Sequence, residues 1–168
     1  KIEAKGSDNT DVRMVINEKE YFVRINLPGG YNIYNACSTV ACGKALGLDM
    51  AVTVKALSAF SCGFGRMEKF EIEGVPLRMI LIKNPAGCNQ AFTYVTSFKD
   101  PFNAVLCLNN RTGDGHDFSW IENTDYEKLC SDPYLQKLYV CGDRAQGLYD
   151  RLKRAGADES RMDLVTEY

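Results

Sequence analysis

The stretch AVLCLNNRTGDGHDFSW, residues 104–120, carries the most information about the fold and function of this chain. Its first five residues have the character of a buried strand, and the rest is rich in Asn, Asp and Gly, which favour tight turns. In an open α/β sheet, loops at the carboxyl ends of strands hold ligands and chemistry. This loop also contains the only histidine, His116, between two aspartates. We interpret 109–120 as a candidate functional site, although an ordinary surface turn explains the same residue types almost equally well.

Composition restricts the classes of protein to which the chain can belong. Its 168 residues suffice for one domain, or for one domain and part of another, and 45% hydrophobic residues are enough to bury a core. A formal net charge of −2 provides no basic surface for nucleic acid. No apolar run approaches the ~20 residues that span a bilayer, and no signal peptide is recognisable. The chain does not begin with Met, so we expect a fragment or a processed form.

The seven cysteines are irregularly spaced, and no CxxC pair occurs. This spacing argues against a zinc ribbon or a thioredoxin-type site. Most of the cysteines lie in apolar company, such as Cys107 in AVLCLNN and Cys141 in LYVCG, and read as small core residues. The pattern predicts a reducing, cytoplasmic compartment.

Strand-like and helix-like segments alternate along most of the chain. Residues 1–20 are polar and weakly patterned, and we expect an arm or a truncated element there. The segment LRMILI, 77–82, is almost continuously apolar, which predicts a central parallel strand next to 104–108. The alternation predicts an α/β fold with a Rossmann-like, mostly parallel sheet and flanking helices. The expected strands are 21–26, 69–73, 77–82, 104–108 and 138–141, and the expected helical segments are 31–48, 50–60, 88–98, 125–137 and 143–155, the last ended by Gly156.

Several motifs in a fixed order make the sequence similar to a known family. They are GYNIYNA at 30–36, GRME at 65–68, KNPAG at 83–87, DGHDFSW at 114–120 and RLKRAG at 151–156. Together they resemble the Mur ligases, and most closely the MurT-type subunits of lipid II isoglutaminyl synthase, from about residue 21 to about residue 156. The resemblance implies that 1–62 is the end of the middle, ATP-binding domain and that 63–168 is the carboxy-terminal α/β domain.

The resemblance also implies an activity. Such a subunit uses ATP and Mg²⁺ to activate the α-carboxylate of D-glutamate in the lipid II stem peptide, and ammonia displaces the phosphate. A separate GatD-type glutaminase supplies the ammonia; the carboxy-terminal domain docks it and lends it an aspartate. The chain contains no G-x-x-x-x-G-K-[ST] phosphate loop and lacks the four-cysteine zinc ribbon of many relatives. We therefore expect this chain alone to be inactive and to bind no nucleotide tightly.

Two aspartates are candidates for the residue lent to the glutaminase. Asp117 and Asp114 lie in the strand-end loop, where a carboxylate can hold the partner's imidazole in one tautomer while the thiolate attacks glutamine. We place Asp117 slightly ahead of Asp114. The alternative role for either one is to cap the segment that follows. We interpret His116 as a polar loop residue and Trp120 as a buried anchor of the loop.

Three further residues are candidate nucleotide contacts by resemblance. Asn35 would bind the adenine edge, toward which an amide can both donate and accept; its alternative role is a cap at the helix start. Arg66 would reach the phosphates, with a surface ion pair as the alternative. Lys83, at a strand end, is a weaker candidate. For Asp143 and Arg144, which begin the last helix, we favour capping.

Two other functions stay open. The chain could be a non-catalytic α/β partner-binding module whose DGHD loop only recruits a partner. Adding purified glutaminase and measuring glutamine hydrolysis distinguishes this module from a ligase subunit. A nucleotide-binding α/β protein unrelated to the cell wall is disfavoured, because no glycine-rich phosphate loop follows a strand.

Overall fold

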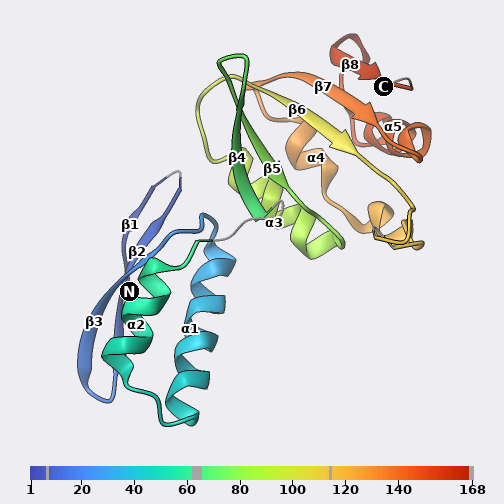
Figure 1. Ribbon diagram of the computed structural model, residues 1–168. Coiled ribbons are helices and arrows are strands. Elements are labelled where there is room, and N and C mark those ends of the chain that lie inside the picture. Colours follow the sequence, from blue (N-terminus) through green and yellow to red (C-terminus); the bar gives the residue numbers. More distant parts are fainter. Residues whose placement is uncertain (7, 62–65, 114, 167–168) are drawn as a thin grey trace. The chain divides into compact units, whose positions relative to one another are not determined.

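In this computed structural model, the chain forms two compact units, Lys1–Leu81 and Ile82–Tyr168 (Figure 1). The structure describes residues 1–6, 8–61, 66–113 and 115–166, and for Lys5 and Arg66 it describes only the backbone. The domain boundary expected between residues 62 and 63 falls outside these ranges and stays a prediction. Within the described ranges, no helix is long and apolar enough to cross a membrane.

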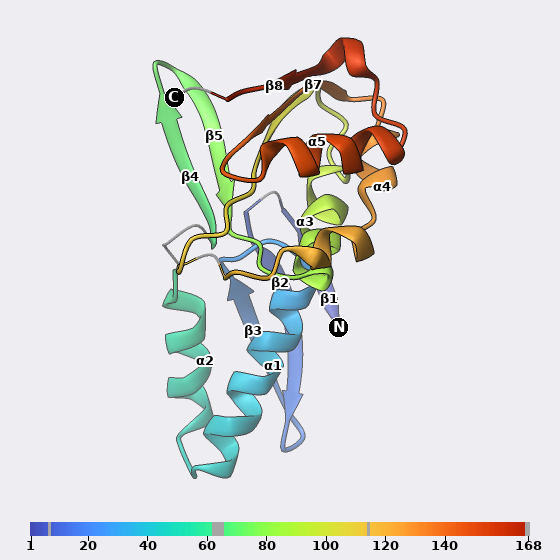
Figure 2. The same ribbon diagram turned by 90° about the vertical axis from the view of Figure 1, so that its right-hand side faces the viewer.

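The first unit is built on a three-stranded antiparallel sheet with two helices against it. Figures 1 and 2 show the two helices side by side. The sequence predicts both helices with nearly the same bounds. The strands are β1 (Ile2–Lys5), β2 (Thr10–Ile16) and β3 (Lys19–Ile25), in that spatial order, and the helices are α1 (Gly30–Ala45) and α2 (Met50–Ala59). The core of this unit, which we call the first core, consists of Val12, Met14, Ile16, Val23, Ile25, Ala36, Val40 and Val54.

The expectation of an arm or a truncated element at residues 1–20 is wrong, because β1, β2 and the start of β3 occupy it. In β2, Val12, Met14 and Ile16 are buried, and the residues between them face solvent or are half-buried. This is the period-two pattern of a strand with one buried face. The exposed Val15 between Met14 and Ile16 breaks the alternation of apolar and polar residues, which is why the sequence read as weakly patterned.

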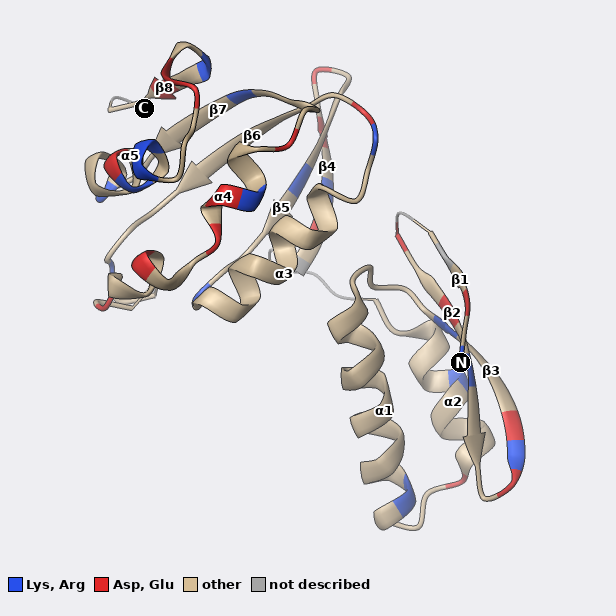
Figure 3. Ribbon diagram, turned by 180° about the vertical axis from the view of Figure 1, so that it is seen from behind, with Lys and Arg blue, Asp and Glu red and all other residues tan. Residues whose placement is uncertain are grey.

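Helix α1 is rich in small residues in its second half, and Lys44 is its one charged side chain (Figure 3). Small residues let helices approach closely. A Cβ atom added at Gly43 would lie 3.1 Å from Cγ2 of Thr53 on α2, which is tighter than ordinary contact. Gly43 therefore sets the closeness of α1 and α2.

A β-hairpin completes the described part of the first unit. Its strands, β4 (Arg66–Ile72) and β5 (Val75–Ile80), pair antiparallel. The two residues between them, Glu73 and Gly74, have φ angles of +51° and +79°. Positive φ at both central residues is typical of a tight two-residue hairpin turn.

The prediction that 77–82 forms a central parallel strand next to 104–108 is wrong. The strand β5 pairs with β4 instead, and Leu77 and Met79 are 39% and 48% exposed. The apolar run suggested burial on both faces, but the two-residue turn dictates a local antiparallel partner, since parallel neighbours need a crossover of a dozen residues or more.

The second unit confirms the Rossmann-like prediction. Its sheet is parallel, with β7 between β6 and β8, and the helices pack on one face. In chain order the elements are α3 (Pro85–Val95), β6 (Phe102–Cys107), η1 (Ser119–Asn123), α4 (Tyr126–Cys130), β7 (Leu135–Cys141), α5 (Ala145–Arg154), η2 (Glu159–Arg161) and β8 (Met162–Leu164). Trp120 packs against the same core, but it is half-buried and not the buried anchor that the sequence predicts.

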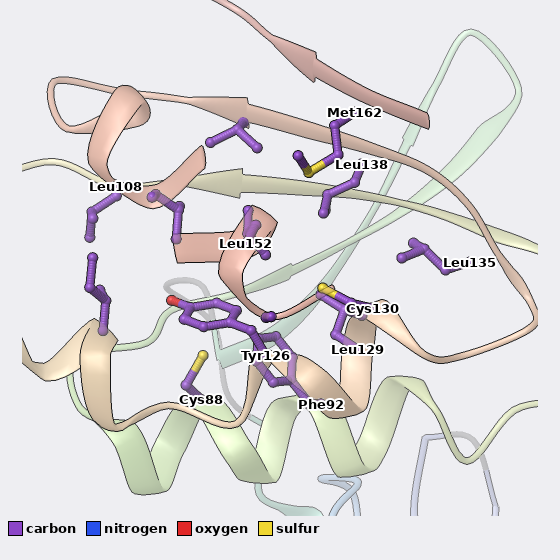
Figure 4. Packing of buried hydrophobic residues seen from close by; sticks show 14 of the residues in the cluster. Cys88, Phe92, Leu108, Tyr126, Leu129, Cys130, Leu135, Leu138, Leu152 and Met162 are labelled. Carbon is purple, nitrogen blue, oxygen red and sulfur yellow. The ribbon is translucent and has the colours of Figure 1, made fainter. Parts of the chain in front are cut away.

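The core of the second unit, which we call the second core, lies between this sheet and its helices (Figure 4). Leu138 and Val140 of β7 and Leu152 of α5 are at most 1% exposed. Phe92 and Tyr126 pack with their ring centroids 5.4 Å apart. The alternate residues of β6 and β7 face away from these helices and are exposed or half-buried.

The end of α5 is as the sequence predicts. Gly156 has φ of +84°, and its N–H donates to Lys153 O at 3.0 Å, while the N–H of Ala157 donates to Leu152 O at 3.1 Å. These two bonds define a Schellman motif, which requires a left-handed residue and so favours glycine.

Candidate functional site at the carboxyl edge of the parallel sheet

The strands β6 and β7 run in the same direction, so their carboxyl ends lie side by side at one edge of the sheet. The N–H of Leu108 donates to Cys141 O at 3.0 Å. In return, Leu108 O accepts from the N–H of Arg144 at 2.9 Å. The side chain of Asn109 adds a third bond, because its Oδ1 accepts from the N–H of Asp143 at 2.9 Å. These bonds fix the start of the 109–118 loop to the turn between β7 and α5.

Gly142 makes this close approach possible. Its φ is +99°, and a Cβ atom there would lie 2.5 Å from Leu108 O and 2.8 Å from Asn109 Oδ1. Any side chain would therefore clash with main chain as well as strain the backbone. The glycine is a requirement of the junction.

An ion pair ties the loop to the same turn a second time. Nε and Nη2 of Arg111 donate to the two carboxylate oxygens of Asp143 at 2.9 and 3.0 Å. This bidentate geometry is the strong form of the Arg–carboxylate pair. The guanidinium lowers the pKa of Asp143, chiefly through the hydrogen bonds. Asp143 is therefore a charged partner of the loop.

The expectation that Asp143 and Arg144 cap α5 is wrong. Arg144 stands at the N-cap position, but no side chain makes a capping hydrogen bond there. Its guanidinium instead lies 4.6 Å from the centroid of the Phe118 ring. With the amide oxygen of Asn110 turned toward it, that oxygen accepts from Nε and Nη2 at 3.2 and 2.6 Å. Both residues thus hold the loop.

Asp117, the leading candidate for the lent aspartate, is exposed on this loop. Its Oδ1 accepts from the backbone N–H of Ser119 at 2.8 Å, at the start of η1. Hydrogen bonds from the Ser119 hydroxyl and backbone lower the pKa of Asp117, so it is ionised near neutral pH. The capping alternative is wrong, because Phe118 holds the N-cap position of η1 and no side chain makes a capping hydrogen bond there. The bond from Ser119 instead braces the loop. A carboxylate offers about four acceptor positions, so a second donor can still bind. Asp114 lies outside the described residues.

Lys83 lies beside the same loop, since its Nζ donates to Gly113 O at 3.0 Å. The Nδ1 atom of His116 is 3.1 Å from Asn110 O. His116 is exposed and braces the loop, in agreement with its interpretation as a polar loop residue. Of the candidate site residues, the structure brings together Lys83 and the loop that carries Asp117.

Asn35 and Arg66 belong to the first unit. Asn35 is exposed on α1, and its Nδ2 donates to Asn32 Oδ1 at 3.2 Å. Because α1 begins at Gly30, Asn35 is not its cap, and that alternative is wrong. Arg66 begins β4, and its side chain lies outside the described residues. Their roles as nucleotide contacts stay predictions.

A hollow of about 460 Å³ opens beside the strand ends, on the sheet face that points away from the helices. Val105, Tyr139 and the thiols of Cys107 and Cys141 are among its walls. Burial and a hydrogen bond with Cys107 raise the pKa of Cys141 to about 11. The interpretation of these two cysteines as core residues is wrong, because Cys107 is exposed and Cys141 is half-buried.

Sequence reasoning missed Arg111 and its pairing with Asp143. The usable signal was a charged residue within three positions of the end of each of two expected strands, because the carboxyl ends of neighbouring parallel strands meet. Among the side chains that the structure describes, no group of three or more His, Cys, Asp or Glu residues is placed to hold a metal ion.

The chain is similar in sequence to known proteins. The family model described as "MurT ligase C-terminal" matches residues 81–168. The lipid II isoglutaminyl synthase (glutamine-hydrolyzing) subunit MurT of Streptococcus pneumoniae is 34% identical over 148 residues, 88% of this chain and 32% of the relative. The subunit of the same name from Staphylococcus aureus (strain COL) is 34% identical over 152 residues, 90% of this chain and 33% of the relative. The chain thus spans about a third of the length of these relatives.

A solved structure shares the fold. The crystal structure of MurF from Acinetobacter baumannii aligns with a TM-score of 0.73 at 17% identity, over 99% of this chain and 35% of that one. At this identity the likeness concerns the fold alone.

Proposed function

Because this chain belongs to the MurT ligase C-terminal family, we propose that it is part of the ligase subunit of a lipid II isoglutaminyl synthase. In the complete enzyme, ATP with Mg²⁺ activates the α-carboxylate of D-glutamate in lipid II, and ammonia from a GatD-type glutaminase displaces the phosphate. The second unit docks the glutaminase and lends it an aspartate. The observation that carries this proposal is the exposed carboxylate of Asp117 on a loop braced at the carboxyl edge of the sheet.

The geometry around Asp117 suits such a role. An aspartate that completes a site on another chain must be exposed on its own domain, ionised and held in place. The hydrogen bonds from Ser119 lower its pKa, which favours the ionised form. The backbone bond to Ser119 also fixes the direction of the carboxylate. The second oxygen can then accept from the imidazole of the partner and stabilise the imidazolium as the thiolate attacks the glutamine amide.

The nucleotide contacts of this chain form a separate part of the proposal. ATP supplies the phosphoryl group that activates the carboxylate. Asn35 offers an exposed amide for the adenine edge, and Lys83 and Arg66 offer cationic groups for phosphate. In a complete subunit, Asn35→Ala should raise the KM for ATP while glutamine hydrolysis by the partner stays unchanged.

The test of the main proposal uses the complete subunit with its glutaminase. Asp117→Asn keeps the size of the side chain and removes its charge, so glutamine-dependent amidation should fall while ammonia-dependent amidation persists. The loss should be smaller than the ~10⁴-fold loss in a serine protease triad, because a cysteine thiolate depends less on its third member. Asp114→Asn is the matched control and should leave glutamine use largely intact.

The second candidate function is the non-catalytic partner-binding module. The bond between Asp117 and the Ser119 amide favours it, since that bond by itself explains an aspartate at this position. If both variants bind the glutaminase and support normal glutamine hydrolysis, neither carboxylate is catalytic and the module is the correct description. If Asp114→Asn alone abolishes glutamine use, Asp114 is the lent residue.

A further inference from the structure

Cys107 and Cys141 occupy paired positions on neighbouring parallel strands, β6 and β7. Paired residues point to the same face of a sheet, and neighbouring strands lie about 4.7–4.9 Å apart. The register therefore places both side chains on one face, and both thiols are free. Cys107 is exposed and Cys141 is half-buried. The chain therefore presents two adjacent thiols on an accessible sheet face.

We propose that Cys107 and Cys141 form a reactive dithiol that is reversibly oxidised to a disulfide by low-molecular-weight disulfides. The strand spacing falls within the range of about 4.4–6.8 Å that disulfides require between Cα atoms. Paired side chains in a parallel sheet project in parallel, so the Cβ atoms must move together to reach the usual ~3.8 Å. A bond closed under such strain is readily reduced, as labile and regulatory disulfides are.

The exchange proceeds in two balanced steps. The thiolate of the more exposed Cys107 attacks one sulfur of the small disulfide, forms a mixed disulfide and releases one thiol. Cys141 then attacks the Sγ of Cys107, forms the protein disulfide and releases the second thiol. The protein loses two electrons and two protons, and the small disulfide gains them. Part of the raised pKa of Cys141 comes from Cys107 itself, and that contribution from a charged Cys107 disappears in the mixed disulfide.

The dithiol is linked to the loop of the candidate site. Nδ2 of Asn109 donates to the Sγ of Cys107 at 3.5 Å, and Oδ1 of the same residue accepts from the N–H of Asp143 at 2.9 Å. Drawing Cys107 toward Cys141 changes the first of these contacts. Oxidation should therefore alter the start of the 109–118 loop. This inference does not depend on the proposed function.

The test is titration of the folded chain with glutathione disulfide, followed by acid quenching, alkylation and peptide mapping. We expect a Cys107–Cys141 linkage that dithiothreitol reverses. In Cys141→Ser, the glutathione adduct on Cys107 should accumulate, because this variant lacks the neighbouring thiol that displaces glutathione. In the unchanged chain that thiol acts at an effective concentration on the order of millimolar or above. Accumulation of the same adduct to the same level in the unchanged chain would overturn the proposal.

Cys37 and Cys42 are the control, since both are exposed and both belong to α1. They should give glutathione adducts without a linkage between them. The buried thiols Cys88 and Cys130 report on folding. If they react as fast as Cys107, the linkage arises from unfolded chains, and the proposal is wrong.

Discussion

In the first unit, α1 and α2 pack against an antiparallel sheet. In the second unit, α3, α4 and α5 pack against a parallel sheet. In the first unit, a tight turn at Asn17 and Glu18, both with positive φ, joins the end of β2 directly to the start of β3. No longer loop leaves the sheet there. In the second, β6 and β7 end at the same edge, and the loops beyond them meet. The difference explains why residues distant in sequence, such as Arg111 and Asp143, assemble a polar cluster in the second unit.

The largest expected effects on stability come from truncating one buried side chain in each of the two cores. Leu152 is 0% exposed in the second core and Val23 is 2% exposed in the first. Leu152→Ala should cost about 3–4 kcal/mol through lost burial and a cavity, and Val23→Ala about 2 kcal/mol because it removes less volume. Trp120 is the only tryptophan and packs against the second core, so urea unfolding followed by its fluorescence reports on that unit.

The same unfolding experiment tests whether the two cores unfold independently. Leu152→Ala should shift the fluorescence transition, and Val23→Ala should shift the transition seen by far-ultraviolet circular dichroism while leaving the fluorescence midpoint in place. If Val23→Ala moves the fluorescence midpoint by as much as Leu152→Ala does, the two cores unfold as one cooperative system.

Replacing Gly142 or Gly147 by Ala should change the stability of the second unit in opposite directions. Gly142→Ala should destabilise it by about 2 kcal/mol or more, because a Cβ atom would lie 2.5 Å from Leu108 O at a φ of +99°. Gly147 lies in α5 with nothing within 4 Å of an added Cβ. Gly147→Ala should therefore stabilise the unit by about 0.5–1 kcal/mol through helix propensity. Urea midpoints from Trp120 fluorescence measure both, and equal effects would refute the close approach.

The buried amide side chain of Asn32 allows a corresponding stability test in the first unit. Asn32 is 6% exposed, and its Nδ2 donates to Pro28 O at 2.7 Å. Asn32→Ala should cost about 1–2 kcal/mol, because the carbonyl at the start of α1 loses its partner. Circular dichroism should detect this loss, and the fluorescence of Trp120 should not. Asn35→Ala removes only the bond that Asn32 Oδ1 accepts, so it should cost less than Asn32→Ala.

The smallest expected effect is a pH dependence in the second unit. Arg151 donates to Glu127 at 3.1 Å and lowers the pKa of that carboxyl. A lowered folded pKa contributes stability above the unfolded value, and this stability is lost as the pH falls through the folded value. Glu127 is 55% exposed, so solvent screening keeps the contribution below about 1 kcal/mol.

Glu127→Gln should therefore lower the urea midpoint slightly at pH 7, and the difference from wild type should vanish as the pH falls through the lowered pKa of the folded carboxyl. A gap between variant and wild type that persists at the lower pH would mean that the ion pair is not the cause.

The sequence predicts more of the second unit than of the first. Short apolar runs, 104–108 and 138–141, mark β6 and β7, and Gly156 marks the end of α5, because strands and left-handed caps depend on local residue types. The strand β2 escaped prediction because the exposed Val15 interrupts the alternation of apolar and polar residues. The pairing of β5 with β4 depends on the turn at Gly74, a signal that the apolar run obscured. The pairing of Arg111 with Asp143 depends on strand order, which no local pattern contains.

The junction of β6 and β7 has a consequence for how such a loop can diversify. The bonds between Leu108 and its two partners, Cys141 and Arg144, join main-chain atoms only. Replacing side chains farther along the loop, from 112 to 119, leaves these bonds intact. Evolution, or a designed library, can thus exchange the recognition surface while the scaffold that presents it persists, with Gly142 as the one position at the junction that tolerates no side chain.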